Sequence, residues 1–235
     1  MIKLSLIAVI VVIAGIVIPE KACSAVLLSL DGTAMPTTHV LTSFSTGTIG
    51  GYVWKNDSNM TPVRRDVGQS FYTADSITLE SFGLQLNGNI QGGDPGAEFT
   101  VSIYQSSALN SIGTLLTSET GIFPTSGMAA GTGSGQWLNF NLTDLTLQGQ
   151  YYYTLMLTWT TPAVNRNLVF SAVTAGGYAS GSVWSSADGS SFAQQGSDYY
   201  FYVQGVTVPE PSSTALLMGA GMVLIAGLRL RNQRS

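Results

Sequence analysis

The sequence predicts an all-β protein, an antiparallel two-sheet β-sandwich of jelly-roll type, on three observations. Between residues 69 and 207, apolar and polar residues alternate with the period of two that is typical of half-buried strands. Spacers rich in Gly, Asn, Asp and Ser separate these runs and are long for hairpin turns. No stretch in this region combines a sustained helical stripe with capping residues. Short strands with such loops favour a sandwich whose loops cluster at its ends.

The first two predicted strands of this region show which side chains face the core. Residues 77–87 alternate and then change phase, which predicts a β-bulge or bend near Ser81. In residues 99–104 alternation predicts one buried face, made of Phe99, Val101 and Ile103.

The later strands carry large aromatic residues. Residues 136–142 place Trp137 on the opposite face from Leu138 and Phe140. In residues 151–159 Trp159 continues an aliphatic face and is predicted to be core. The run 199–202 is expected to alternate between the core and an exposed row of tyrosines. Residues 31–66 are less regular and predict one or two leading strands with a long loop.

Residues 1–25 are predicted to be a secretory signal peptide. Lys3 supplies the positive start, residues 4–18 form an apolar segment, and small residues precede the expected cut after Ala25. The apolar segment is shorter than the roughly 20 residues that cross a bilayer comfortably, which favours cleavage over a permanent anchor. Cys23 lies within the predicted signal peptide, and Glu20 and Lys21 before it disfavour a lipoprotein signal, so the exported part is expected to have no cysteine.

Residues 26–208 are predicted to form a single exported domain, which is a length that supports one hydrophobic core. This region contains eleven acidic and four basic residues, a net charge of −7. The region has no basic cluster able to contact successive phosphates of a nucleic acid, so nucleic-acid binding is not expected. The basic residues are Lys55, Arg64, Arg65 and Arg166.

Residues 209–235 have three parts with distinct physical roles. Pro209-Glu210-Pro211 lacks two backbone donors and is restricted to an extended conformation, which a peptidase can thread through its active site. Residues 215–228 are apolar but, as a helix, are shorter than the hydrocarbon layer of about 30 Å. A basic end would stay on the cytoplasmic side, and it consists of Arg229, Arg231 and Arg234.

This tail resembles the PEP-CTERM sorting signal of bacteria that make exopolysaccharide. Pro-Glu-Pro, a short apolar helix with glycines and an Arg-rich end occur in that order at the terminus. The resemblance implies a membrane-bound precursor, inserted through the C-terminal segment and processed by exosortase, an inner-membrane cysteine peptidase. It also implies export through the inner membrane to the cell envelope or extracellular matrix. The alternative is an ordinary single-pass tail with a chance Pro-Glu-Pro.

Residues 68–160 are similar to the choice-of-anchor R domain, a family defined by its association with such tails. Residues 69–73 and 77–79 match its opening element, residues 99–104 and 113–116 its centre, and residues 145–147 and 151–157 its last strand. Gly149-Gln150 departs from the more Asn/Thr-like turn of the family. The family has no established catalytic residues, so the resemblance implies none here.

Catalytic chemistry finds little support in the residues. His39, the single histidine, is expected to lie in a loop or on the surface, whereas a catalytic triad needs a buried and oriented imidazole. Glycoside hydrolysis needs only two carboxylates, so a carbohydrate-active hydrolase stays open as a minor alternative. The glutamates of the exported part are Glu80, Glu98 and Glu119.

No cofactor is predicted, and a structural calcium ion is the one metal considered. Asp94, Glu98 and Asp188 lie in loop-like stretches, but neither stretch has the dense Asp/Asn spacing of a calcium loop. Their Asp-Pro-Gly and Asp-Gly sequences are ordinary turn chemistry.

The remaining candidates are aromatic residues that could stack on sugars. Trp54 and Trp184 stand among polar residues that we interpret as loops, and Tyr178 is a further candidate for glycan contact. The sequence therefore predicts an exported structural or adhesive protein of the exopolysaccharide or biofilm matrix. The alternative is a protein like a carbohydrate-binding module.

Overall fold

The computed structural model describes residues 25–47, 49–87, 96–123, 135–160, 166–173 and 177–209. Within these ranges the regular structure is entirely β, which confirms the all-β prediction. The same ranges contain no helix of the length and apolar character needed to span a membrane. Residues 1–24 of the predicted signal peptide and residues 210–235 of the predicted tail lie outside the described residues, whereas Ala25 belongs to the first strand and pairs with Thr120. The strands are β1 (Ala25–Leu30), β2 (Val40–Phe44), β3 (Ile49–Asn56), β4 (Arg64–Thr73), β5 (Ile77–Gln85), β6 (Glu98–Ser106), β7 (Thr114–Ile122), β8 (Trp137–Leu147), β9 (Tyr151–Trp159), β10 (Arg166–Val173), β11 (Val183–Ser186), β12 (Ala193–Gln194), β13 (Asp198–Tyr199) and β14 (Phe201–Thr207).

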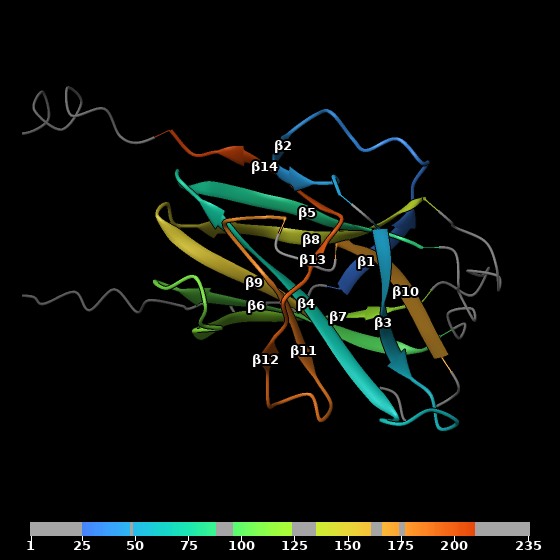
Figure 1. The fold of residues 1–235 in the computed structure, drawn as a ribbon. Coiled ribbons are helices and arrows are strands. Elements are labelled where there is room, and N and C mark those ends of the chain that lie inside the picture. The colour runs from blue at the N-terminus through green and yellow to red at the C-terminus, as the bar shows by residue number, and fades with distance from the viewer. Residues whose placement is uncertain are drawn as a thin grey trace, which may run out of the picture.

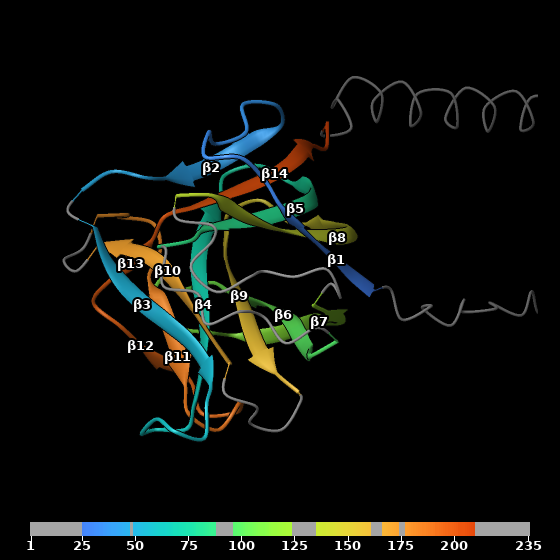
Figure 2. The same ribbon diagram turned by 90° about the vertical axis from the view of Figure 1, so that its right-hand side faces the viewer.

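These strands form one continuous, nearly closed and barrel-like sheet, where the sequence had predicted two separate sheets. Neighbouring strands follow the order β13-β10-β3-β4-β9-β6-β7-β1-β8-β5-β14-β2, and β11 attaches to β4 and carries β12. In the view of Figure 2, β2, β14, β5 and β8 cross the top of the molecule, and β6, β7 and β9 lie below them. Strands β3 and β10 lie at one side in both views (Figures 1 and 2), and β13 lies beside them in Figure 2.

Two strands connect what would otherwise be separate sheets, because each changes its partner along its length. Strand β1 pairs parallel to β7 through Ala25 and Val26, and then antiparallel to β8 through residues 27–30. Strand β4 pairs with β3 at Arg64 and Arg65, and with β11 from residue 66 to 69 on the same side. Such changes of partner depend on contacts distant in sequence, so alternation of polarity could not reveal them.

The main core lies inside the curved sheet and follows the predicted faces. Phe99, Val101 and Ile103 are all buried, as is Trp159. The bulge predicted near Ser81 is confirmed, because the pairing of β5 with β8 shifts register between Leu79 and Ser81.

A second, smaller apolar cluster lies apart from the main core. It contains Trp137 together with Tyr200 and Tyr202, which confirms that Trp137 faces away from Leu138 and Phe140. The predicted exposed tyrosine row is wrong, since residues 199–202 are all buried. The segment before β2 helps to cover the tyrosine side, with the Tyr202 hydroxyl 3.4 Å from the Asp31 carboxylate.

Candidate functional site

Trp54, predicted as a loop residue that contacts glycans, is instead in the centre of the core. It belongs to β3 and has 0% exposed surface. Its ring stacks on Trp159 with 4.4 Å between centroids and also packs edge-on against Phe99 at 5.7 Å. A buried indole has no free face for a sugar, so its location corrects the prediction.

Trp184 is also on a strand and not in a loop. It lies on β11, is 5% exposed, and its indole nitrogen is 3.4 Å from the Ser70 hydroxyl oxygen. Its placement likewise leaves little ring surface for stacking.

Tyr178 is the only one of the three predicted glycan residues that is partly exposed in the structure. Its hydroxyl lies 3.1 Å from the Thr42 hydroxyl, and its ring packs edge-on against Phe201 at 5.0 Å. Burial raises the pKa of the Tyr178 phenol, while the hydrogen bond with Thr42 opposes this shift. The glycan contact of Tyr178 stays a prediction.

A pocket of about 190 Å³ lies where β4 ends, close to Tyr178 through their common neighbour Thr42. We call it the threonine pocket, because three threonines line it among aliphatic and aromatic side chains. Its lining consists of Leu41, Thr42, residues 71–75, Ile77, Val203 and Thr207.

A second hollow, of about 250 Å³, lies where β4 begins, and we call it the arginine hollow. It forms where the neighbour of β4 changes from β3 to β11. Strand β3 pairs with Arg64 and Arg65 of β4, and β11 pairs with β4 from Asp66 onward. Its lining consists of Tyr52, Pro62, Arg64, Arg65, residues 185–187 and Gln195.

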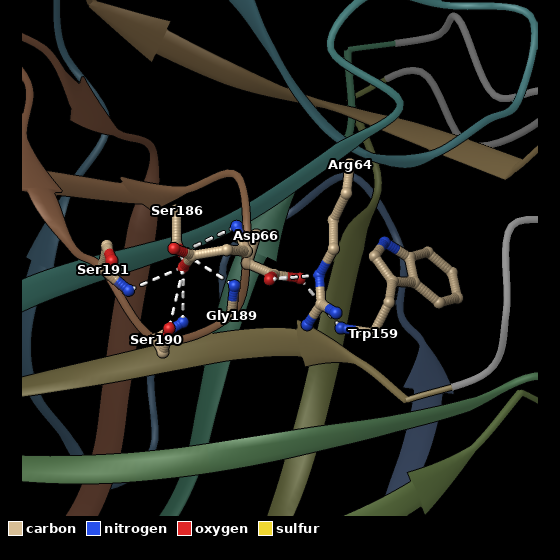
Figure 3. Close-up of polar contacts among 8 residues, drawn as sticks. Arg64, Asp66, Trp159, Ser186, Gly189, Ser190 and Ser191 are labelled. Atoms are coloured by element: carbon tan, nitrogen blue, oxygen red, sulfur yellow. Dashed lines mark hydrogen bonds and ion pairs between the residues drawn. The ribbon is translucent and has the colours of Figure 1, made fainter.

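Asp66 forms a buried ion pair with Arg64 beside this hollow (Figure 3). The Nε–H of Arg64 donates to one carboxylate oxygen at 2.6 Å, and the backbone N–H of Trp159 donates to the other at 2.9 Å. Burial raises the pKa of Asp66 to about 6, although both hydrogen bonds and the Arg64 charge oppose the shift. The ion pair therefore holds Arg64 in place at the edge of the hollow.

Figure 3 shows Gly189, Ser190 and Ser191 of the loop after β11 beside this ion pair. Hydrogen bonds to Asp188 hold this loop. One Asp188 carboxylate oxygen accepts hydrogen bonds from the Ser190 and Ser191 amides at 2.8 and 2.7 Å, and from the Ser186 hydroxyl at 2.9 Å. These donors lower the pKa of Asp188. This is the geometry of a carboxylate that stabilises its own turn, in agreement with the turn chemistry expected of Asp-Gly.

Basic residues concentrate around the arginine hollow. The strand register places Lys55 opposite Arg65, and Asn56 between Arg64 and Arg166. All four basic residues of the predicted exported domain therefore lie on three adjacent strands, β10, β3 and β4. Burial and the charge of Arg65 lower the pKa of Lys55, whereas Asp57 raises it.

Arg65 differs from Arg64 in its partners. Its guanidinium carbon lies 5.0 Å from the centre of the Tyr52 ring, a cation–π contact. Within the described ranges no carboxylate lies within ion-pair distance of Arg65. This site was not predicted from the sequence, although two adjacent arginines in a chain with so few basic residues were the available signal.

The carboxylates considered for catalysis and metal binding are separate. His39 is exposed just before β2, as predicted, and its Nδ1 lies 3.0 Å from Glu80. Glu119 accepts from the Thr143 amide at 3.2 Å, Glu98 is exposed on β6, and Asp94 is outside the described residues. In the described part of the chain, neither hollow is lined by two carboxylates, and no three His, Cys, Asp or Glu side chains group as metal ligands.

Of the predicted sorting motif, only Pro209 is described. It is exposed and directly follows the last residue, Val208, that pairs with the sheet. The other predicted tail residues lie outside the described ranges, namely Glu210, Pro211, Arg229, Arg231 and Arg234.

Comparisons with known proteins assign no family to this chain. No protein-family model matches it, and a search of curated proteins finds no match either.

Proposed function

We propose that this protein is exported, processed at its tail by exosortase, and retained as a structural or adhesive component of an exopolysaccharide-containing envelope or matrix. In this proposal residues 1–25 direct export through the inner membrane, and residues 26–208 form the functional domain. Residues 209–235 hold a membrane-bound precursor through a short transmembrane helix until they are processed.

The point at which the β domain ends supports the sorting part of the proposal. The Val208 amide donates to the Ser76 carbonyl at 2.8 Å, which is the last backbone bond at this end of the sheet within the described residues. Pro209 has no N–H group to continue the pairing and is exposed. The first residue of the motif therefore directly follows the backbone-bonded residue Val208 and is exposed, which supports access by a peptidase.

Mass spectrometry of the product from an exosortase-positive cell tests the sorting proposal. Replacing Pro209, Glu210 and Pro211 by alanine should leave an unprocessed precursor in the membrane fraction. The matched control is Asn232→Ala with Gln233→Ala, which changes the same tail but keeps the motif and the arginines. A mature wild-type product that still contains residues 229–235 would contradict the proposal.

The arginine hollow favours a second candidate, a saccharide-binding role for the same domain. Adhesion to a matrix requires contact with its polymer, and the hollow offers charged, hydroxyl and amide groups in one place. Small saccharide sites commonly combine a few polar groups with an apolar wall.

A further inference from the structure

We infer that the arginine hollow binds the carboxylate of an acidic sugar, a uronate residue of an anionic polysaccharide, with Arg65 as its principal cation. The inference rests on the proposed function only in taking the matrix as the source of this polymer. It adds a site and a ligand class that the sorting proposal does not contain.

Arg65 is the residue best placed to meet an incoming anion. It lines the hollow, and among the described residues it has a cation–π contact with Tyr52 but no carboxylate partner. A guanidinium presents a planar set of N–H donors that matches a carboxylate with two parallel hydrogen bonds. The contact with Tyr52 orients the group without using its hydrogen-bonding edge.

Arg64 contributes a second positive group whose position is already determined. Its Nε–H is used by Asp66, and its side chain is 28% exposed at the edge of the hollow. The Asp66 carboxylate that holds it is 0% exposed and is shared with the Trp159 amide. A positioned donor loses little conformational entropy on binding, which favours affinity.

The carboxylates near the hollow are occupied by internal partners. Asp57 is buried and accepts from the Asn59 amide at 2.9 Å and from the Asn167 side chain at 3.3 Å. Asp188 accepts from its own loop. The anionic ligand therefore does not compete with these groups for their donors, and the lining that it meets contains, among the described residues, two arginines and no carboxylate.

The neutral part of the lining is suited to one sugar ring. The Ser185 hydroxyl and the Gln195 side chain, which donates to it at 2.9 Å, provide polar groups, while Pro62 and Tyr52 provide apolar surface. The volume of about 250 Å³ is below the roughly 300–1,000 Å³ of pockets for drug-sized ligands. We therefore expect one uronate residue of a longer chain to enter the hollow.

Titration calorimetry with the full chain in non-ionic detergent tests the inference. The probes are polygalacturonate, free galacturonate, the neutral polymer dextran, and inorganic sulfate. Arg65→Gln should weaken polygalacturonate binding about ten- to a hundredfold, the range for a lost charged hydrogen bond. Arg65→Lys should restore part of the affinity, because it keeps the charge but not the planar donors.

Two further variants separate the site from general charge and from misfolding. Ser43→Asp lowers the net charge by the same amount as Arg65→Gln but changes an exposed residue of β2 that does not line the hollow, so it should leave binding unchanged. Gln195→Ala keeps the charge and should weaken binding about two- to tenfold through a lost hydrogen bond. Urea unfolding midpoints of all variants should match the wild type.

Three results would overturn the inference: no binding of polygalacturonate, equal binding of dextran, or an Arg65→Gln variant that binds like the wild type. Displacement of the polymer by sulfate at the same concentration as by galacturonate would also overturn the inference, because the hollow would then be a general anion site. Each of these results leaves the mass of the processed tail, and so the sorting proposal, untouched.

Discussion

Strand β4 begins at the arginine hollow and ends at the threonine pocket, and the two regions are built in different ways. At the arginine end the neighbour of β4 changes from β3 to β11, and a buried ion pair lies at the change. At the other end β4 stays paired with β9 to its last residue, Thr73. Hydroxyl, aliphatic and aromatic side chains line the pocket there with one carboxylate, Asp75, which has no ion-pair partner among the described residues.

The difference is that a charged side chain bonds the backbone at the arginine end of β4. The last β4–β9 pair at this end is Val67 with Leu157, so the Trp159 amide has no carbonyl of β4 opposite it. The Asp66 carboxylate accepts the hydrogen bond from this amide instead. Its own charge is then balanced by Arg64. At Thr73, where the pairing of β4 with β9 is unbroken, the side-chain bond at the strand end is neutral: the Thr73 hydroxyl donates to the Gln148 carbonyl.

The largest expected effect concerns the aromatic stack below the arginine end. Trp54→Ala should lower the free energy of unfolding by about 3–5 kcal/mol, since it removes a fully buried ring that stacks on Trp159. Urea unfolding followed by circular dichroism measures this. Trp54→Phe is the control and should cost clearly less, because it keeps a ring and removes an indole N–H that has no partner among the described atoms. Equal, small losses for both would mean that the stack does not support this end.

The next effect is a dependence of stability on acidic pH, which we expect from Asp66 at the arginine end. Because the pKa of Asp66 is raised from 3.8 to about 6, the folded state holds this proton more tightly than the unfolded chain. Stability from this group is therefore greatest below pH 4 and falls by up to about 3 kcal/mol as the pH rises to 6. Arg64 and Asp188 are the other charged groups that affect Asp66.

Unfolding measured at several pH values checks this slope against Asp66→Asn. The asparagine cannot ionise, so the difference in stability between the two proteins should change with pH between 4 and 6. Asp188 has the opposite sign: its lowered pKa adds stability above its ordinary pKa that is lost as the pH falls. A wild-type-to-variant difference that is constant with pH would contradict the role assigned to Asp66.

A smaller effect is expected for the loop beside the hollow. Gly189 has a φ of +81°, and a Cβ there would lie 2.5 Å from an Arg64 guanidinium nitrogen. Gly189→Ala should cost about 1–2 kcal/mol through the left-handed backbone and displace Arg64. Gly196→Ala is the matched control, because a Cβ at Gly196 meets nothing within 4 Å, and it should be neutral or slightly stabilising. Thermal unfolding compares them, and equal melting temperatures would show that the loop does not restrain Arg64.

The smallest expected effect is at the threonine pocket. Tyr178→Phe removes the hydrogen bond with Thr42 but keeps the ring against Phe201, so it should cost at most about 1 kcal/mol. Urea unfolding midpoints measure it, with Thr42→Ser as the control that retains a hydroxyl. A loss as large as that of Trp54→Ala would remove the distinction between the two ends.

The features that the sequence predicted correctly depend on short-range patterns. Alternation over a few residues placed Phe99 and Trp159 in the core, and a change of phase located the bulge at Ser81. Closure of the sheet was not predicted, because β1 and β4 change partners through contacts that are far apart in the sequence.

Trp54 was assigned to a loop because the polar residues 55–57 follow it. Those residues are themselves buried: Lys55 is opposite Arg65 in the register, and Asp57 accepts from the Asn167 side chain at 3.3 Å. Polar residues with cross-strand partners can thus be internal, and a sequence does not show the partners. The arginine hollow was missed for the same reason, since it is made by residues on β3, β4 and the segment around β11.

The position of β1 has a kinetic consequence. Leu27 pairs with Asn141, which lies 114 residues later, and together β7 and β8 form the slot that β1 occupies. Closing so large a loop is slow, because its entropy is lost before the contact can compensate. Strand β1 therefore cannot complete its pairing until β8 has formed, and until then β7 and β8 present open edges that can pair with another chain. Refolding yield should consequently fall as the protein concentration rises.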